Sequence, residues 1–80
     1  MDMEEAESRV NIAKANHERR GRAKLALKQY AEASGDVDAD KASTMVDLLA
    51  DLQHYAEASG LDWTEVTEGA SRHYNIERLG

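Results

Sequence analysis

Between residues 45 and 59, side chains suited to a buried face recur at spacings of three and four, the pattern of one face of an α-helix. Ser43 or Thr44 can cap such a helix, and Asp47 lies in its first turn, where a negative charge is favourable. We therefore predict a helix over residues 44–59. Its buried stripe comprises Met45, Leu48, Leu49, Leu52, Tyr55, Ala56 and Ser59.

A second helix start is marked by Asp62 and Glu65, which have the spacing of a capping box. Leu61 precedes this start and Val66 follows it, so these two side chains can pack together as a hydrophobic staple. The pattern predicts a helix over residues 63–76. Its buried side would carry Val66, Ala70 and Tyr74, flanked by Trp63.

The region before residue 34 also favours helix, since the chain contains no proline and residues 4–33 are rich in Ala, Glu, Lys and Leu. Its apolar positions are sparse, and the stretch KANHERRGR at 14–22 has almost nothing to bury. Gly21 lies in the middle, where it costs about 1 kcal/mol relative to alanine and favours a bend or break. We predict a helix over residues 4–33 and expect residues 1–21 to be extended, mobile or covered by a second copy.

A seven-residue phrase occurs twice, as QYAEASG at 29–35 and HYAEASG at 54–60. Leu27 and Leu52 also match, but little else does, so a repeat architecture is not indicated. Each copy places apolar side chains on one face and a glycine, Gly35 or Gly60, where a helix would end in the left-handed conformation. We interpret the phrase as a helix ending used twice, with gene duplication as the alternative.

These patterns together predict an all-α fold in a single domain over residues 1–80, with a long first helix followed by a helical hairpin. A chain this short builds only a small core, so we expect an oligomer, most simply a dimer. The predicted core is Leu27, Tyr30, Met45, Leu48, Leu49, Leu52, Tyr55, Trp63, Val66, Ala70 and Tyr74.

Composition and charge narrow the function. The chain has no cysteine, which excludes disulfides, and no apolar run long enough for a signal peptide or a membrane span, so we expect an intracellular, soluble protein. The net charge of −6 argues against nucleic acid as the default partner. The charge is divided, however: residues 9–28 hold seven basic side chains against Glu18, whereas residues 36–68 hold nine acidic ones against Lys41.

Metal binding is a weaker interpretation of the acidic residues. The loop GDVDADKAS at 35–43 has the D-x-D-x-D spacing of a calcium loop, but it lacks that loop's glycine and its terminal glutamate. Asp47, Asp51 and His54 share a helical face and could hold a metal together with His73. A capped loop and a solvated acidic face explain the same residues more simply, so we expect no metal and no other cofactor.

The stretch from Val46 to Tyr74 resembles a group of small proteins of phages, plasmids and integrative elements. Their pattern is VDLL-x-DL-x-H, an aromatic residue, four further residues and GLD, followed by a small residue and HY; here it reads VDLLADLQHYAEASGLD and ASRHY. The resemblance covers about residues 45–74 and implies an accessory protein of a mobile element in the cytoplasm of a bacterial host. Proteins in that setting, including anti-CRISPR and antirestriction proteins, often act by binding host machinery.

No pattern of a catalytic nucleophile or a phosphate-binding loop is present, so we predict that the protein is not an enzyme. We expect it to bind a protein of a host defence or nucleic-acid-binding complex through an acidic surface comprising Asp36, Asp38, Asp40, Asp47, Asp51 and Glu57. The alternative is a small helix-turn-helix-like DNA-binding regulator that uses Arg19, Arg20, Arg22 and Lys24 of the basic first helix. Against that alternative, the second hairpin helix would present Glu65 and Glu68 to DNA phosphates.

Overall fold

The computed structural model describes the backbone of residues 3–79 and the side chains of residues 9–78. This part of the chain is all-α, with helices α1 (Met3–Ser34), α2 (Lys41–Ala58) and α3 (Trp63–Leu79). The three predicted helices are therefore confirmed within a few residues at each end. Residues 1 and 2 of the segment expected to be extended or mobile lie outside the described residues.

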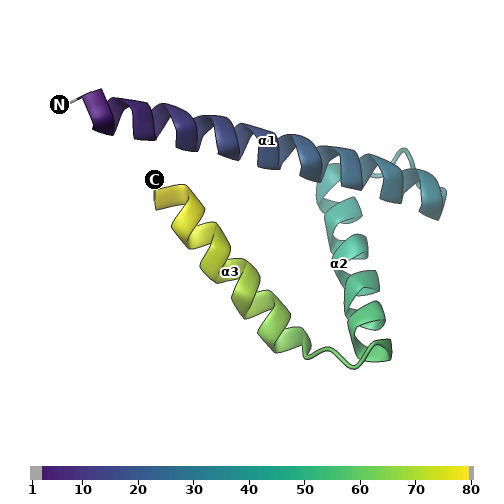
Figure 1. The fold of residues 1–80 in the computed structure, drawn as a ribbon. Helices are drawn as coiled ribbons and strands as arrows, with labels where there is room; N and C mark the ends of the chain where they lie inside the picture. The colour runs from purple at the N-terminus through teal and green to yellow at the C-terminus, as the bar shows by residue number, and fades with distance from the viewer. Residues whose placement is uncertain (1–2, 80) are drawn as a thin grey trace.

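The helices form the three sides of a triangle (Figure 1). Helix α1 is the long side, α2 leaves from its C-terminal end, and α3 returns so that its C-terminal end lies near the N-terminal half of α1. The arrangement measures 49 × 31 × 16 Å, so it is little thicker than one helix with its side chains, which is about 10–12 Å. Its radius of gyration is 16.2 Å, whereas a compact domain of this length has roughly 12 Å.

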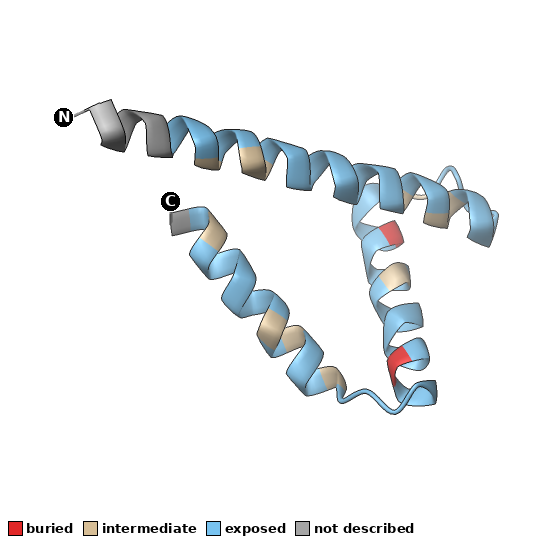
Figure 2. Ribbon diagram, in the orientation of Figure 1, coloured by how far each residue is buried: buried red, intermediate tan, exposed pale blue. Residues whose placement is uncertain are grey.

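The predicted core is wrong for the single chain. Among the described side chains only Thr44 and Ala56 are buried, as Figure 2 shows. Leu27, Tyr30, Leu48 and Trp63 are half-buried, and the other members of the predicted core are exposed: Met45, Leu49, Leu52, Tyr55, Val66, Ala70 and Tyr74. Ala56 belongs to the predicted stripe of α2, whereas the burial of Thr44 was not predicted. The helices meet near their ends rather than along their lengths, so their apolar faces are not covered.

Helix α1 runs without interruption through Gly21, although the sequence favoured a bend or break there. The backbone of Gly21 keeps a negative φ, and no neighbouring atom lies within 4 Å of the position that a Cβ would occupy. The cost of a glycine in a helix, about 1 kcal/mol, is small beside the cost of breaking a helix of this length, which would leave several backbone groups unbonded.

Both copies of the repeated phrase end a helix, as predicted. Gly35 and Gly60 are the two described glycines with positive φ, at 79° and 74°. In the second copy the N–H of Leu61 donates to the carbonyl of Ala56 at 2.8 Å, and the N–H of Gly60 donates to that of Glu57 at 3.2 Å. This is the Schellman pattern, and the first copy repeats it after Ser34.

The start of α2 differs from the prediction, whereas the start of α3 agrees with it. Asp40, not Ser43 or Thr44, caps α2, because its carboxylate accepts hydrogen bonds from the N–H and the hydroxyl of Ser43 at 2.8 and 3.0 Å. The helix therefore begins at Lys41, and Asp47 lies beyond its first turn. At α3 the carboxylate of Asp62 accepts from the N–H of Glu65 at 3.1 Å, which is the first of the two hydrogen bonds of a capping box.

Candidate protein-binding surfaces

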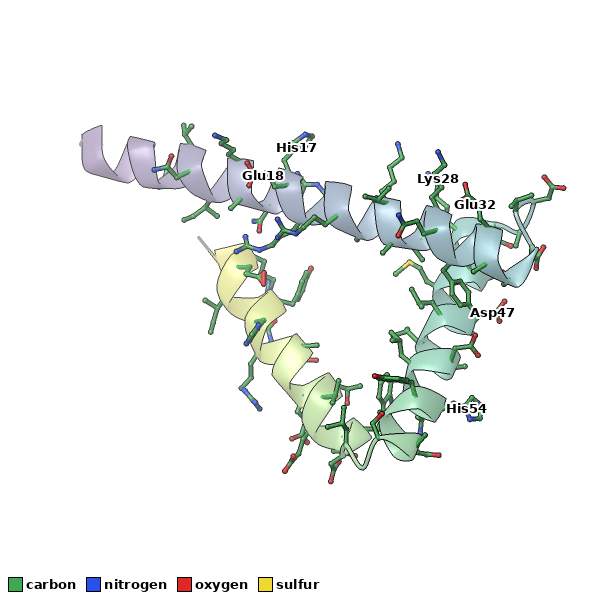
Figure 3. All side chains as sticks on the ribbon, turned by 45° about the vertical axis from the view of Figure 1, so that its right-hand side comes forward. His17, Glu18, Lys28, Glu32, Asp47 and His54 are labelled. Carbon is green, nitrogen blue, oxygen red and sulfur yellow. The ribbon has the colours of Figure 1, made fainter. Side chains whose placement is uncertain are left out.

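The outer face of α2 carries Asp47, Asp51 and His54, which lie within about one quarter of the helix circumference of one another. Figure 3 shows His54 pointing away from α1 and α3, and Asp47 nearer to the C-terminal end of α1. All three side chains are exposed. Glu57, also exposed, is rotated by about a quarter turn from Asp47 and borders this face. With the loop before α2, these carboxylates form the outer acidic face, comprising Asp36, Asp38, Asp40, Asp47, Asp51 and Glu57.

Two members of the outer acidic face are already engaged within the chain. The hydrogen bonds from Ser43 hold the pKa of Asp40 below its ordinary value, since they stabilise the ionised carboxylate. Asp51 accepts a hydrogen bond of 2.5 Å from the hydroxyl of Tyr30, which joins α1 to α2. This hydrogen bond, followed by partial burial and the negative charges of Asp51 and Asp47, raises the pKa of Tyr30 to about 12. Asp36, Asp38, Asp47 and Glu57 are therefore the members best placed to meet a partner.

The opposite side of α2 is apolar. Met45, Leu49 and Leu52 lie about half a turn from Asp47. Because His54 points out of the triangle in Figure 3, this opposite side of α2 faces its inside. On α3, Ala70 and Tyr74 line a cleft against α1, so the stripe that includes Val66 also faces inward. We call these six residues the inner face: Met45, Leu49, Leu52, Val66, Ala70 and Tyr74. All of them are exposed in the single chain.

The contact between α1 and the C-terminal end of α3 is polar. The guanidinium Nε of Arg19 lies 2.9 Å from a carboxylate oxygen of Glu77, and the side-chain amide of Asn16 donates to the backbone carbonyl of Glu77 at 3.0 Å. Arg19 also donates to the amide oxygen of Asn16. Sequence reasoning missed this contact, because Glu77 lies about 60 residues away and carries no motif that would pair it with α1.

A cleft of about 590 Å³ opens beside this contact. Its lining is formed by Asn16, Arg19, Arg20, Ala23, Ala70, Tyr74, Glu77 and Arg78. Its lining combines three arginines with two alanines and a tyrosine. One of the arginines, Arg19, already neutralises Glu77, so the cleft is not uniformly basic.

The four basic residues of the DNA-binding alternative do not form one patch. Arg19 and Arg22 lie on one side of α1, whereas Arg20 and Lys24 lie on another, separated by about a quarter turn or more. All four are exposed. On α3, the helix that would enter the major groove, Glu65 and Glu68 lie on the side opposite the inner face and are exposed as well.

No group of three or more histidine, cysteine or carboxylate side chains among the described residues is arranged to hold a metal ion. Within the same residues, none of the helices combines the length and apolar character needed to cross a membrane. Comparisons with models of protein families, with curated proteins and with solved structures gave no match to this chain.

Proposed function

We propose that this chain is a non-enzymatic protein-binding module whose outer acidic face docks onto a basic partner. The observation that carries the proposal is the set of exposed carboxylates, with Asp47 and Glu57 on α2 and Asp36 and Asp38 in the loop that precedes it. The ion pair given above for α1 and α3 uses Glu77, which lies outside this face. The negative electrostatic potential of the outer acidic face can therefore attract a positively charged surface.

The class of partner follows from the charge and from the resemblance of residues 45–74 to mobile-element proteins. Host complexes that bind nucleic acid carry basic grooves that neutralise phosphates, and an acidic helix can occupy such a groove in place of the nucleic acid. We therefore propose an accessory protein of a mobile element that inhibits a host defence complex, as anti-CRISPR proteins do. Binding of this kind needs a rigid display of charge rather than a catalytic pocket.

A pair of charge reversals tests the proposal. The double variant Asp47→Lys and Glu57→Lys alters the outer acidic face but leaves the cap at Asp40 and the Tyr30 hydrogen bond to Asp51 intact. The control variant Glu65→Lys and Glu68→Lys makes the same change on α3, and because each reversal adds two charges, both double variants move from −6 to −2. Isothermal titration with a candidate defence complex captured from nuclease-treated host lysate should show at least a tenfold loss of affinity for the first variant only.

Salt provides an independent measurement. Raising the salt concentration from 0.1 to 1 M shortens the Debye length from about 10 Å to about 3 Å, so the wild-type complex should weaken steeply. The α2 double variant should lose most of that dependence. If the two double variants bind with equal affinity and with the same dependence on salt, the outer acidic face does not bind the partner and the proposal is wrong.

Direct DNA binding is the second candidate, favoured by the excess of basic residues on α1. Arg20, Arg22 and Lys24 are exposed and can contact phosphates. A mobility-shift assay with duplex DNA distinguishes the two functions, because DNA retention abolished by Arg20→Glu and Lys24→Glu would support the regulator. The wide separation of these side chains around the helix makes protein binding the better-supported function.

A further inference from the structure

The inner face leaves large apolar side chains of α2 and α3 in contact with water. Leu49 is 51% exposed and Tyr74 is 66% exposed, although both belong to amphipathic stripes that normally form a core. Contiguous exposed apolar patches on a protein surface often mark interaction sites. Val46, Tyr55 and Ile76 are exposed on other sides of these helices. The inner face differs from them because it joins a stripe of α2 to a stripe of α3 that both face the inside of the triangle.

The accessible surface of the whole chain shows how much must be covered. It amounts to 6749 Å². A compact monomer of 8.9 kDa exposes roughly 4800 Å², so each chain carries an excess of roughly 1900 Å². This excess is spread over all three helices, and two chains that covered all of it would bury roughly 3800 Å² in total, which lies within the range of about 2,000–5,000 Å² found for obligate homodimers.

We propose that the inner face is covered in solution by the inner face of a second copy of this chain, in a two-fold symmetric dimer. An isologous contact places the same patch on both chains, so one stripe from α2 and one from α3 of each copy suffice to build a four-helix core. The dimer is independent of the proposed function, since the inner face and the outer acidic face lie on opposite sides of α2.

The distribution of charge also fits a second copy. One chain holds a basic block at 9–28 and an acidic block at 36–68. Arg19 of the basic block forms its ion pair with Glu77, which does not belong to the acidic block. Because the outer acidic face lies on the opposite side of α2 from the inner face, an isologous contact through the inner faces does not press the acidic residues of the two copies together, so the net negative charge opposes association only weakly. The structure thus moves the expected self-contact from residues 14–22 to the hairpin of α2 and α3.

Two leucines with matched exposure provide the test. Leu49 on the inner face is 51% exposed, and Leu25, on the side of α1 turned away from Ala23 and Leu27, is 57% exposed. Light scattering after gel filtration of the wild type, from 1 µM to 1 mM, should give about twice the chain mass of 8.9 kDa. Leu25→Glu should keep this mass, whereas Leu49→Glu should weaken the dimer at least 100-fold or prevent folding.

A second measurement applies if Leu49→Glu fails to fold. A mixture of ¹³C-methyl-labelled and unlabelled wild-type chains should show intermolecular nuclear Overhauser effects from the methyl groups of Met45, Leu49 and Leu52. A wild type that has the monomer mass at every concentration overturns the proposal, and the inner face would then belong to a different protein. A dimer that is insensitive to Leu49→Glu, equally disrupted by Leu25→Glu, or without these intermolecular effects overturns it as well.

Discussion

Replacing glycine by alanine should change stability in opposite directions at Gly21 and Gly60. Gly21 lies inside α1, and an added Cβ would meet no atom within 4 Å. The substitution Gly21→Ala therefore removes only the entropic cost of a helical glycine and should raise the free energy of unfolding by about 1 kcal/mol. Gly60 has a φ of 74°, which costs an alanine about 1–2 kcal/mol, so Gly60→Ala should lower that free energy by about 1 kcal/mol.

The assay is thermal unfolding followed by circular dichroism at one fixed protein concentration, because association shifts the midpoint. For a chain of this length 1 kcal/mol corresponds to a change in Tm of about 4–8 °C, so the two variants should differ by roughly 8–16 °C. Gly35→Ala is the matched control and should behave like Gly60→Ala, since Gly35 has a φ of 79°. A Gly21→Ala variant that lowers Tm would refute the continuous α1, because it would show that the chain needs the glycine to bend there.

Three further outcomes follow from the caps and corners of the triangle. Asp62→Ala should cost about 0.5–2 kcal/mol in unfolding experiments, since it removes the cap of α3, and Asp62→Asn should restore most of the loss. Absorbance titration at 295 nm should show Tyr30 ionising near pH 12, and Asp51→Asn should lower this pKa toward 10. Because the pKa of Tyr30 is raised in the folded state, the stabilisation from its contact with Asp51 is complete below about pH 10 and is lost as the pH rises through about 12. Glu77→Gln should cost less than about 1 kcal/mol, because its ion pair with Arg19 is solvent-accessible, and a larger loss in chemical denaturation would contradict that assignment.

The sequence predicted the features that depend on neighbouring residues. The stripe of α2, the capping side chain Asp62 and the helix endings at Gly35 and Gly60 arise from interactions over three to five residues, and each has a recognisable spacing. The cap of α2 was misplaced for a local reason. Asp36, Asp38, Asp40 and Ser43 can all cap a helix, and their spacing alone does not rank them, so the choice depends on whether Lys41 continues the helix.

The relative placement of the helices could not be predicted in the same way. Periodicity identifies which side of α2 is apolar, but it does not say whether α1, α3 or another chain covers that side. Arg19 pairs with Glu77 only because the fold brings the C-terminal end of α3 back to α1. Charged surface residues are too common for the sequence alone to show which two of them form an ion pair. The sequence likewise identified the acidic residues of the candidate binding surface. It could not show that Tyr30 donates a hydrogen bond to Asp51, because that bond depends on how α1 packs against α2.

The thin triangular arrangement has a consequence for how long the protein survives in a cell. With only Thr44 and Ala56 buried among the described side chains, each helix is held mainly by its own backbone hydrogen bonds, and local opening exposes cleavable peptide bonds. A partner that binds only the folded form suppresses this opening in proportion to its concentration. Resistance to proteolysis should therefore increase with the amount of bound partner, so that turnover removes chains that have found none.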